Sequence, residues 1–224
     1  MIHTNETIHH NNQYKVTTSW LFVGGLLLTG IGAAFAPWVW QDGVALQITA
    51  PGLAEFVKFL PEVRSGQLQI NRLQSLYPLF VVILSWVISI ANQELSLPLW
   101  LKGILLIGVV PLGLAALSPV WTPEILVAEE FRSQTIIVVI AIGLIVLAPL
   151  LQKLPFKALI VIISVANIVA LTQATRLFNT VQAAIANSYQ GEIILGWGWW
   201  LTIAGILLSS LAGLWLGFYH YFSK

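Results

Sequence analysis

The chain has 224 residues, of which 58% are hydrophobic and 8% are charged, and its formal net charge is +1 at pH 7. This charged fraction lies far below the roughly 25% of a typical soluble domain, so a water-soluble fold would expose large apolar patches. The near-neutral charge excludes the concentrated basic face that nucleic-acid binding needs. The absence of cysteine excludes disulfides and thiolate metal sites.

Six stretches of at least 18 residues contain no Asp, Glu, Lys or Arg. About 20 apolar helical residues cross the ~30 Å hydrocarbon layer of a bilayer, because a helix rises about 1.5 Å per residue. The sequence therefore predicts an all-α fold, a polytopic transmembrane helical bundle with about six spanning helices. A polar N-terminal tail at 1–17 precedes a single transmembrane domain at 18–224. The predicted spans are about 18–38, 76–93, 100–118, 134–151, 156–175 and 195–221.

The first predicted span, 18–38, is bounded by tryptophans. Trp20 lies near one end, and Trp38 and Trp40 lie near the other, as is typical of indole rings at the two membrane–water interfaces. Pro37 is expected to end the helix, since proline disfavours helical geometry in the residue before it.

The longest polar connection, 39–75, contains a segment with helical periodicity at 51–63. Glu55 and Lys58 fall on a different face from the apolar residues, which favours a short helix lying in the membrane interface. Alternation of apolar and polar residues at 67–73 is compatible with a short extended piece. The predicted apolar face of the interfacial helix consists of Phe56, Phe59, Leu60 and Val63.

The fifth predicted span, 156–175, is followed by residues that keep helical composition but become polar. We expect the same helix to continue beyond the membrane or along its surface. The loop before the span is short and contains Lys153 and Lys157. Lysines next to the bilayer are typical of the cytoplasmic side. We therefore expect both termini in the cytoplasm, and the tail, the six spans and the absent cysteine are compatible with a bacterial plasma (inner) membrane.

Small residues recur at four-residue spacing along the first, fifth and last predicted spans. This spacing places them nearly on one helix face, where a neighbouring backbone can approach closely. We expect these stripes to pack helices within the bundle; the alternative is that one of them, most plausibly in the last span, binds a separate membrane subunit. The helix-packing residues are Gly205, Ser209, Gly213 and Gly217 in the last span, with Gly25, Thr29 and Ala33 in the first.

No ionisable side chain lies at the centre of a predicted span, although ion-coupled transporters generally need one. Asn167 is the best candidate for a mid-membrane polar contact. An interhelical hydrogen bond is the favoured interpretation, and lining a substrate path together with Thr172 and Gln173 is the alternative.

Acidic residues in the outer loops are a candidate catalytic cluster. No nucleophile–base motif or metal-binding motif accompanies them, and the outer loops contain no histidine. Solvated loop charges are therefore the favoured interpretation, and no catalytic, cofactor-binding or metal-binding residue is predicted. The acids considered are Glu55 with Glu62, and Glu129 with Glu130 beside Arg132.

Three classes of function remain open. The first is a non-enzymatic accessory or scaffold subunit of a membrane assembly, with partner contacts through the outer loops 39–75 and 118–133. The alternative is a permease-type transport component for an apolar or amphipathic substrate, motivated by Pro111 and the polar residues of span 156–175. A membrane enzyme is the third class. The partners expected are the lipid bilayer and other membrane subunits.

Overall fold

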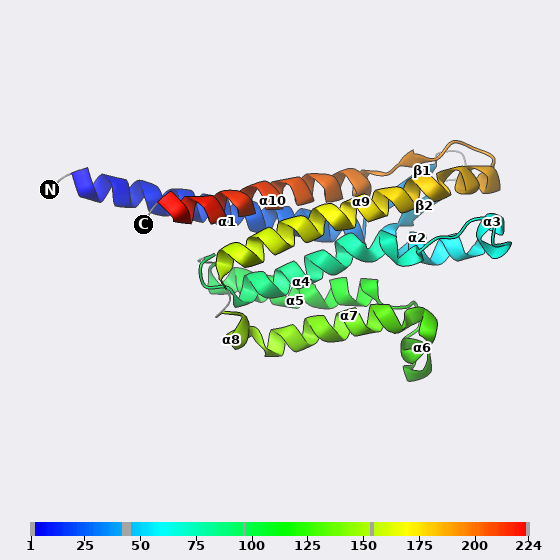
Figure 1. Ribbon diagram of the computed structural model, residues 1–224, viewed down its shortest axis with the longest axis horizontal. Coiled ribbons are helices and arrows are strands. Elements are labelled where there is room, and N and C mark those ends of the chain that lie inside the picture. Colours follow the sequence, from blue (N-terminus) through cyan, green and yellow to red (C-terminus); the bar gives the residue numbers. More distant parts are fainter. Residues whose placement is uncertain (1–2, 42–45, 96, 153–154, 223–224) are drawn as a thin grey trace.

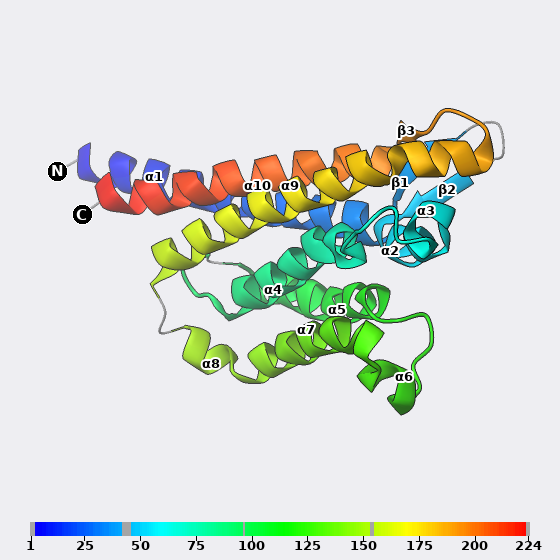
Figure 2. The same ribbon diagram turned by 45° about the vertical axis from the view of Figure 1, so that its right-hand side comes forward.

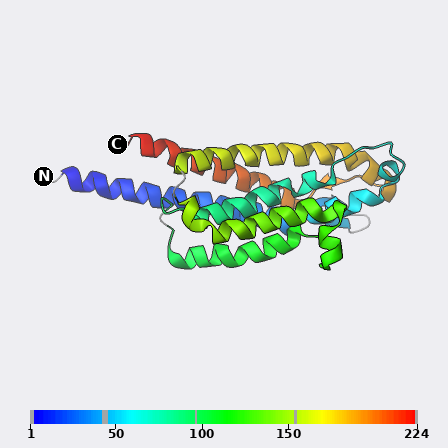
Figure 3. The same ribbon diagram turned by 60° about the horizontal axis from the view of Figure 1, so that its bottom comes forward.

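The computed structural model describes residues 3–41, 46–95, 97–152 and 155–222. Its long helices run side by side along one axis, and α1 (His3–Ala34) begins at the same end of the bundle at which α10 (Trp197–Phe222) finishes (Figure 1, Figure 3). We call this the termini end. The opposite end carries a small β-sheet and is called the sheet end (Figure 2). The predicted all-α helical bundle is confirmed.

Between α1 and α10 lie four further long helices and shorter pieces, most of the latter at the sheet end (Figure 1). In chain order these elements are β1 (Pro37–Gln41), β2 (Leu46–Thr49), α2 (Ala50–Phe56), the 3-10 helix η1 (Val57–Phe59), α3 (Pro61–Arg64), the 3-10 helix η2 (Arg72–Leu76), α4 (Tyr77–Ala91), α5 (Leu99–Ala116), α6 (Pro123–Val127), α7 (Glu129–Val146), α8 (Ala148–Leu151), α9 (Phe156–Tyr189) and β3 (Ile194–Leu195). The four long helices are α4, α5, α7 and α9, and the short helix α8 lies at the other end of the bundle.

Within the described chain, five helical segments are long and apolar enough to cross a membrane by length and composition. Each falls on a span predicted from the sequence, and α4 continues directly from η2. These five segments are Tyr14–Ala34, Arg72–Ala91, Leu99–Ala116, Phe156–Tyr189 and Trp197–Phe218.

The fourth predicted span, 134–151, is not among these five segments. Its helix, α7, begins with Glu129, Glu130 and Arg132 inside the first turn and ends at Val146, and a separate short helix, α8, follows. The charge-free part of α7 covers about 14 residues, or about 21 Å, which is short of the ~30 Å hydrocarbon layer. The chain nevertheless passes along α7 from the sheet end to the termini end (Figure 1).

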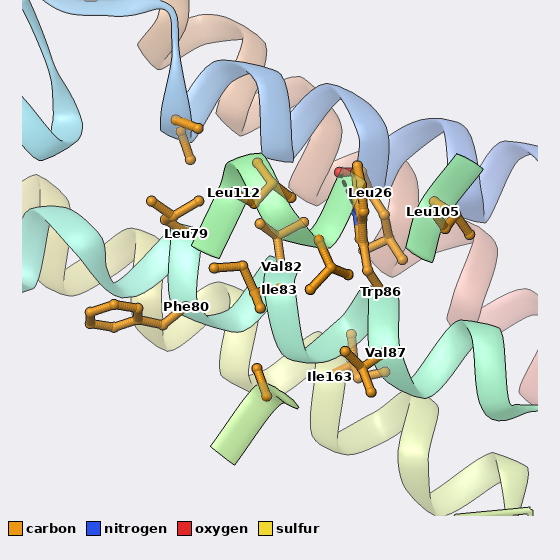
Figure 4. Close-up of a cluster of buried hydrophobic side chains, with 14 of the residues drawn as sticks. Leu26, Leu79, Phe80, Val82, Ile83, Trp86, Val87, Leu105, Leu112 and Ile163 are labelled. Atoms are coloured by element: carbon orange, nitrogen blue, oxygen red, sulfur yellow. Dashed lines mark hydrogen bonds between the residues drawn. The ribbon is translucent and has the colours of Figure 1, made fainter. Parts of the chain in front are cut away.

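The larger core lies around α4, which contacts α1, α5, α7 and α9. Trp86 of α4 points across this core toward Leu26 of α1 (Figure 4). The indole ring lies against Gly108 in α5, where an added Cβ would collide with it, and against Gly30 in α1, where an added Cβ would lie only 3.2 Å from it. Glycines on two neighbouring helices therefore make the space for one large aromatic ring.

A second, smaller core lies at the sheet end, and we call the part of the molecule around it the cap. The continuation of α9 past residue 176 supplies one side of this core, which confirms that the helix extends beyond its predicted span. At about 1.5 Å per residue its 34 residues extend about 51 Å. The buried residues of the cap are Val39, Ile48, Leu53, Val57, Leu60, Leu177, Phe178, Val181, Ala184, Ile185 and Ile193.

The three-stranded antiparallel sheet, in the order β2-β1-β3, was not predicted. Its central strand contains Trp38 and Trp40, which the sequence assigned to the membrane interface. Trp38 is instead completely buried, donates a hydrogen bond of 2.9 Å from Nε1 to the Gly32 carbonyl, and packs edge-on against Trp199. The helix ends at Ala34, before Pro37, because the chain turns there into the sheet.

The predicted interfacial helix at 51–63 is three short pieces, α2, η1 and α3. Pro61 begins α3 after Leu60 takes an extended conformation, which interrupts the helix. The buried face is formed by Leu53, Val57 and Leu60, whereas Phe59, placed on the apolar face by its spacing, is 68% exposed. The extended piece expected at 67–73 is not a strand; η2 begins within it. At the N-terminus, α1 begins at His3, inside the predicted polar tail.

Candidate functional site

The small-residue stripes of the first and last spans face each other in an antiparallel seam between α1 and α10. A Cβ atom added at Gly25 would lie 2.5 Å from the Ser209 backbone nitrogen, and one added at Gly205 would lie 2.5 Å from the Thr29 backbone nitrogen. The Thr29 hydroxyl donates a hydrogen bond of 2.9 Å to the Gly25 carbonyl of its own helix. The two backbones are therefore in direct contact, the close approach that small residues permit between membrane helices.

The remaining stripe residues lie toward the two ends of this seam. Ala33 is completely buried. Gly213 lies against Phe22 of α1 and Ile160 of α9, so it serves a three-helix contact. Gly217 has no neighbour within 4 Å of an added Cβ among the described residues. Most of the small residues of the α10 stripe therefore pack against other helices of the same chain.

Asn167 lies on α9 and is completely buried. Neither of its side-chain atoms, Oδ1 or Nδ2, has a hydrogen-bond partner among the described residues, and the Oγ atoms of Ser164 and Ser210 share this property. The interhelical hydrogen bond expected of Asn167 is therefore not seen in the described chain. Thr172 is exposed and donates to its own helix backbone, whereas Gln173 pairs with Gln74. The three residues proposed to line a path do not face a common space.

At the sheet end, four charged side chains from different elements form a closed network, which we call the clasp. Glu55 of α2 receives Lys58 Nζ on one oxygen at 2.6 Å and Arg72 Nη1 on the other at 2.7 Å. Glu130 of α7 receives Lys58 Nζ at 2.6 Å and lies 3.6 Å from Arg72 Nη2, which also donates to the Glu130 carbonyl at 2.5 Å. The clasp joins the loop before α4 to the start of α7.

Phe131 completes the clasp. Its ring lies 5.1 Å from Lys58 Nζ and 4.9 Å from the Arg72 guanidinium carbon, distances at which the negative ring face attracts cations. The hydrogen bond from Lys58 lowers the pKa of Glu130, aided by the positive charges of Lys58 and Arg72 and opposed by burial. Burial opposes the charge of Lys58, yet its hydrogen bonds to Glu130 and Glu55 raise its pKa above 10.5. Both groups therefore favour their charged forms.

A cleft of about 330 Å³ adjoins the clasp between α2, the end of α5 and the start of α7. Glu55 lines it, but both oxygens of this carboxylate are already engaged by cations. The Ser118 hydroxyl is also engaged, because it donates to the Val120 carbonyl at 2.6 Å. Gln134 is 2% exposed, and its Oε1 atom has no hydrogen-bond partner among the described residues. The complete lining is Pro51, Gly52, Glu55, Leu114, Ala115, Leu117, Ser118, Pro119, Trp121 and Gln134.

The fold thus brings two of the candidate catalytic acids, Glu55 and Glu130, together in the clasp and leaves the others outside it. Glu55 and Glu130 differ from the solvated loop charges that the sequence favoured, because they share two cations. Glu62 lies on α3, outside both the clasp and the cleft lining, and Glu129 and Arg132 are exposed. Sequence reasoning overlooked Arg72, Phe131 and Gln134. For Gln134 the available signal was its four-residue spacing from Glu130, one of the loop acids considered, because such a pair shares a helix face.

In the described part of the chain, no three His, Asp or Glu side chains are grouped so that they could hold a metal ion. A scan against protein-family models, a search of curated proteins and a search of solved structures each found no significant match. The function must therefore be argued from the site itself.

Proposed function

We propose that this protein is a non-enzymatic accessory or scaffold subunit of a membrane assembly, and that it contacts its partner at the sheet end. The observation that carries this proposal is the clasp, which binds the two outer loops into one preformed surface. A preformed surface loses less conformational entropy on binding than two separate loops would.

Exposed apolar side chains on these loops support the proposal. Phe59 is 68% exposed on η1, and Val127 is 70% exposed on α6, while Trp121 lies between α5 and α6. Exposed apolar and aromatic side chains rimmed by polar ones are typical of protein contact sites. The partner expected here is a membrane protein that presents an apolar surface at the same membrane interface.

Site-directed photo-crosslinking in intact membranes tests this proposal. A crosslinking amino acid at Phe59 or Val127 should give a discrete adduct, whereas one at Val165, an exposed residue of α9, should give lipid adducts. Without crosslinking, the partner found in that adduct should remain bound to the chain during purification in mild detergent. A chain that yields no protein adduct from either loop, and that elutes at the mass of one 24.6 kDa chain plus its micelle, would contradict the proposal.

We also propose that both termini face the cytoplasm of a bacterial plasma membrane, as the lysine distribution favours. Because the chain has no cysteine, single introduced cysteines report directly on sidedness. Ser65→Cys at the sheet end should react with a membrane-impermeant maleimide added to intact cells, and Gln93→Cys at the termini end should not. The opposite pattern would reverse the orientation.

A permease-type component for an apolar or amphipathic substrate is the second candidate. The cleft beside Glu55 and Gln134 favours it, because its walls are largely apolar. The separate environments of Asn167, Thr172 and Gln173 weigh against a continuous polar path. Transport of a labelled amphiphile into proteoliposomes would distinguish this candidate from the first.

A further inference from the structure

We propose that the outward face of α7 pairs with the same face of a second copy of this chain, forming a parallel twofold dimer in the membrane. This inference does not depend on the accessory role proposed above. Of the 18 residues of α7, only Gln134 and Ala141 are buried. The helix lies along one edge of the bundle, where it packs against α4 and α5 and leaves its other side uncovered by the described chain (Figure 1, Figure 2).

The outward face follows a regular pattern along α7. Its members recur at alternating spacings of three and four residues, which keeps them on one side of a helix with about 3.6 residues per turn. Ile136, Val139 and Val146 are 47%, 60% and 75% exposed, and a Cβ added at Gly143 would meet no described atom within 4 Å. Two such faces fit together in the left-handed packing that is common among membrane helices. The face consists of Glu129, Arg132, Ile136, Val139, Gly143 and Val146.

The charged end of this face indicates what covers it. Glu129 and Arg132 are both exposed, and neither forms an ion pair with the described residues. Two copies inserted in the same direction are related by a twofold axis along the membrane normal, which places equal residues at equal depth. Glu129 of one copy then lies about 4.5 Å along the axis from Arg132 of the other, within reach of both side chains. The face is therefore complementary in charge to itself.

The length of α7 explains why lipid covers this face poorly. The charge-free part of the helix extends about 21 Å, less than the ~30 Å hydrocarbon layer, so its terminal charges are drawn toward lipid. A charged side chain in lipid is costly unless it is paired, and a span shorter than its bilayer can adjust by associating with another. A second copy supplies the counter-charges and replaces lipid along the short face. The five segments identified as spans are long enough to cross without this adjustment.

Cysteine crosslinking in native membranes tests the inference, because the chain has no cysteine of its own. Ile136→Cys and Val139→Cys, oxidised with copper phenanthroline, should each give a disulfide-linked dimer of twice 24.6 kDa. Ile142→Cys is the matched control, because its site is 55% exposed on the same helix but lies about 100° from Gly143 around the axis. It should crosslink at least about fivefold less, because a disulfide needs Cα atoms within about 7 Å. Membranes are used because excess detergent separates the copies among micelles, where the single chain is measured.

Charge reversal at the end of the face gives a second test. In the Val139→Cys background, Arg132→Glu should lower the crosslinked fraction about two- to fivefold, the usual effect of one exposed ion pair on an association constant. Adding Glu129→Arg should restore the fraction, which a general defect in folding would not allow. The cysteine scan decides the matter alone if Arg132→Glu does not fold. Equal crosslinking of Ile142→Cys, crosslinking of Val165→Cys on α9 in place of the α7 variants, or charge variants that leave the crosslinked fraction unchanged would each overturn the inference.

Discussion

Trp86 donates a hydrogen bond of 3.2 Å from its Nε1 atom to the backbone carbonyl of Leu26, which joins the central helix α4 to α1. The two residues are 60 positions apart in the chain. The ring fits because Gly30 and Gly108 leave room on both neighbouring helices. One side chain thus fixes the spacing of α1, α4 and α5 in the middle of the bundle.

Trp86→Ala should destabilise the bundle by about 3 kcal/mol. This value is at the low end for aromatic-to-alanine changes. In a soluble protein, part of the usual cost is the lost free energy of transferring the ring from water into the core. That part is small here, because the ring of a span that stays in lipid is not exposed to water when the bundle comes apart. Trp86→Phe keeps most of the ring and loses the hydrogen bond, so its loss should be clearly smaller. Helix content followed by circular dichroism during unfolding in dodecyl sulfate measures both. Equal losses for the two variants would show that packing of the ring contributes little.

Gly25→Leu should destabilise the seam between α1 and α10 by about 3 kcal/mol or more. The added side chain would meet the backbone of Ser209 and Gly205, which cannot move aside as a flexible side chain can. Gly24→Leu is a matched control, since an added Cβ there meets no described atom within 4 Å. The same unfolding assay compares the two. If both variants unfolded alike, the close approach of the two helices would be refuted.

Asn167→Leu should leave the stability unchanged or raise it by about 1 kcal/mol. The substitution removes two buried polar atoms without partners among the described residues and keeps a similar volume. Asn187→Leu, at an exposed position of the same helix, should change the stability by less than about 0.5 kcal/mol. A clear loss on Asn167→Leu, with Asn187→Leu neutral, would mean that Asn167 has a polar partner in the membrane.

The clasp should weaken in acid. The folded-state pKa of Glu130 lies below its ordinary value of 4.5, so its contribution is present above that value and is lost as the pH falls through the lowered pKa. The raised pKa of Lys58 means that its contribution persists up to about pH 10.5 and declines above it. The contribution of Glu130 should be below about 1 kcal/mol at pH 7, since the pair is partly exposed to water.

Thermal unfolding of the unaltered protein and of Glu130→Gln between pH 3 and pH 8 measures this effect. Their difference should be largest near pH 7 and should shrink as the pH falls below 4.5 and through the lowered pKa of Glu130. Glu129→Gln is the control, because the adjacent acid forms no ion pair with the described residues. A difference that stays constant over this range would show that the charge of Glu130 does not stabilise the fold.

Sequence reasoning predicted the spans well because their signal is local. A charge-free run of sufficient length is enough, and α9 continues past its apolar part because no proline or glycine interrupts it before Gln190, whose left-handed conformation ends the helix. Sequence reasoning overestimated the length of the apolar helix at 134–151. The first turn of α7 carries three charges, and the helix ends at Val146 before the separate helix α8 begins.

Features that depend on contacts between residues far apart in the sequence could not be predicted from such local signals. The strand Pro37–Gln41 is almost entirely apolar and buried, so it lacks the alternation that indicates a half-exposed strand. Its second neighbour, β3, contains two residues about 155 positions away. For the same reason the two tryptophans in this strand, Trp38 and Trp40, were assigned to the membrane interface. The clasp joins residues up to 75 positions apart, and only its i,i+3 pair, Glu55 and Lys58, follows a spacing rule.

The length of α9 has a mechanical consequence. Of its roughly 51 Å, about 20 Å extends past a ~30 Å hydrocarbon layer, and this part is packed into the cap. A span that is longer or shorter than its bilayer adjusts by tilting. A tilt of about 10° would move the far end of this protruding part by about 3.5 Å parallel to the membrane plane. The lateral position of the cap relative to the spans must therefore follow the thickness of the membrane in which the protein lies.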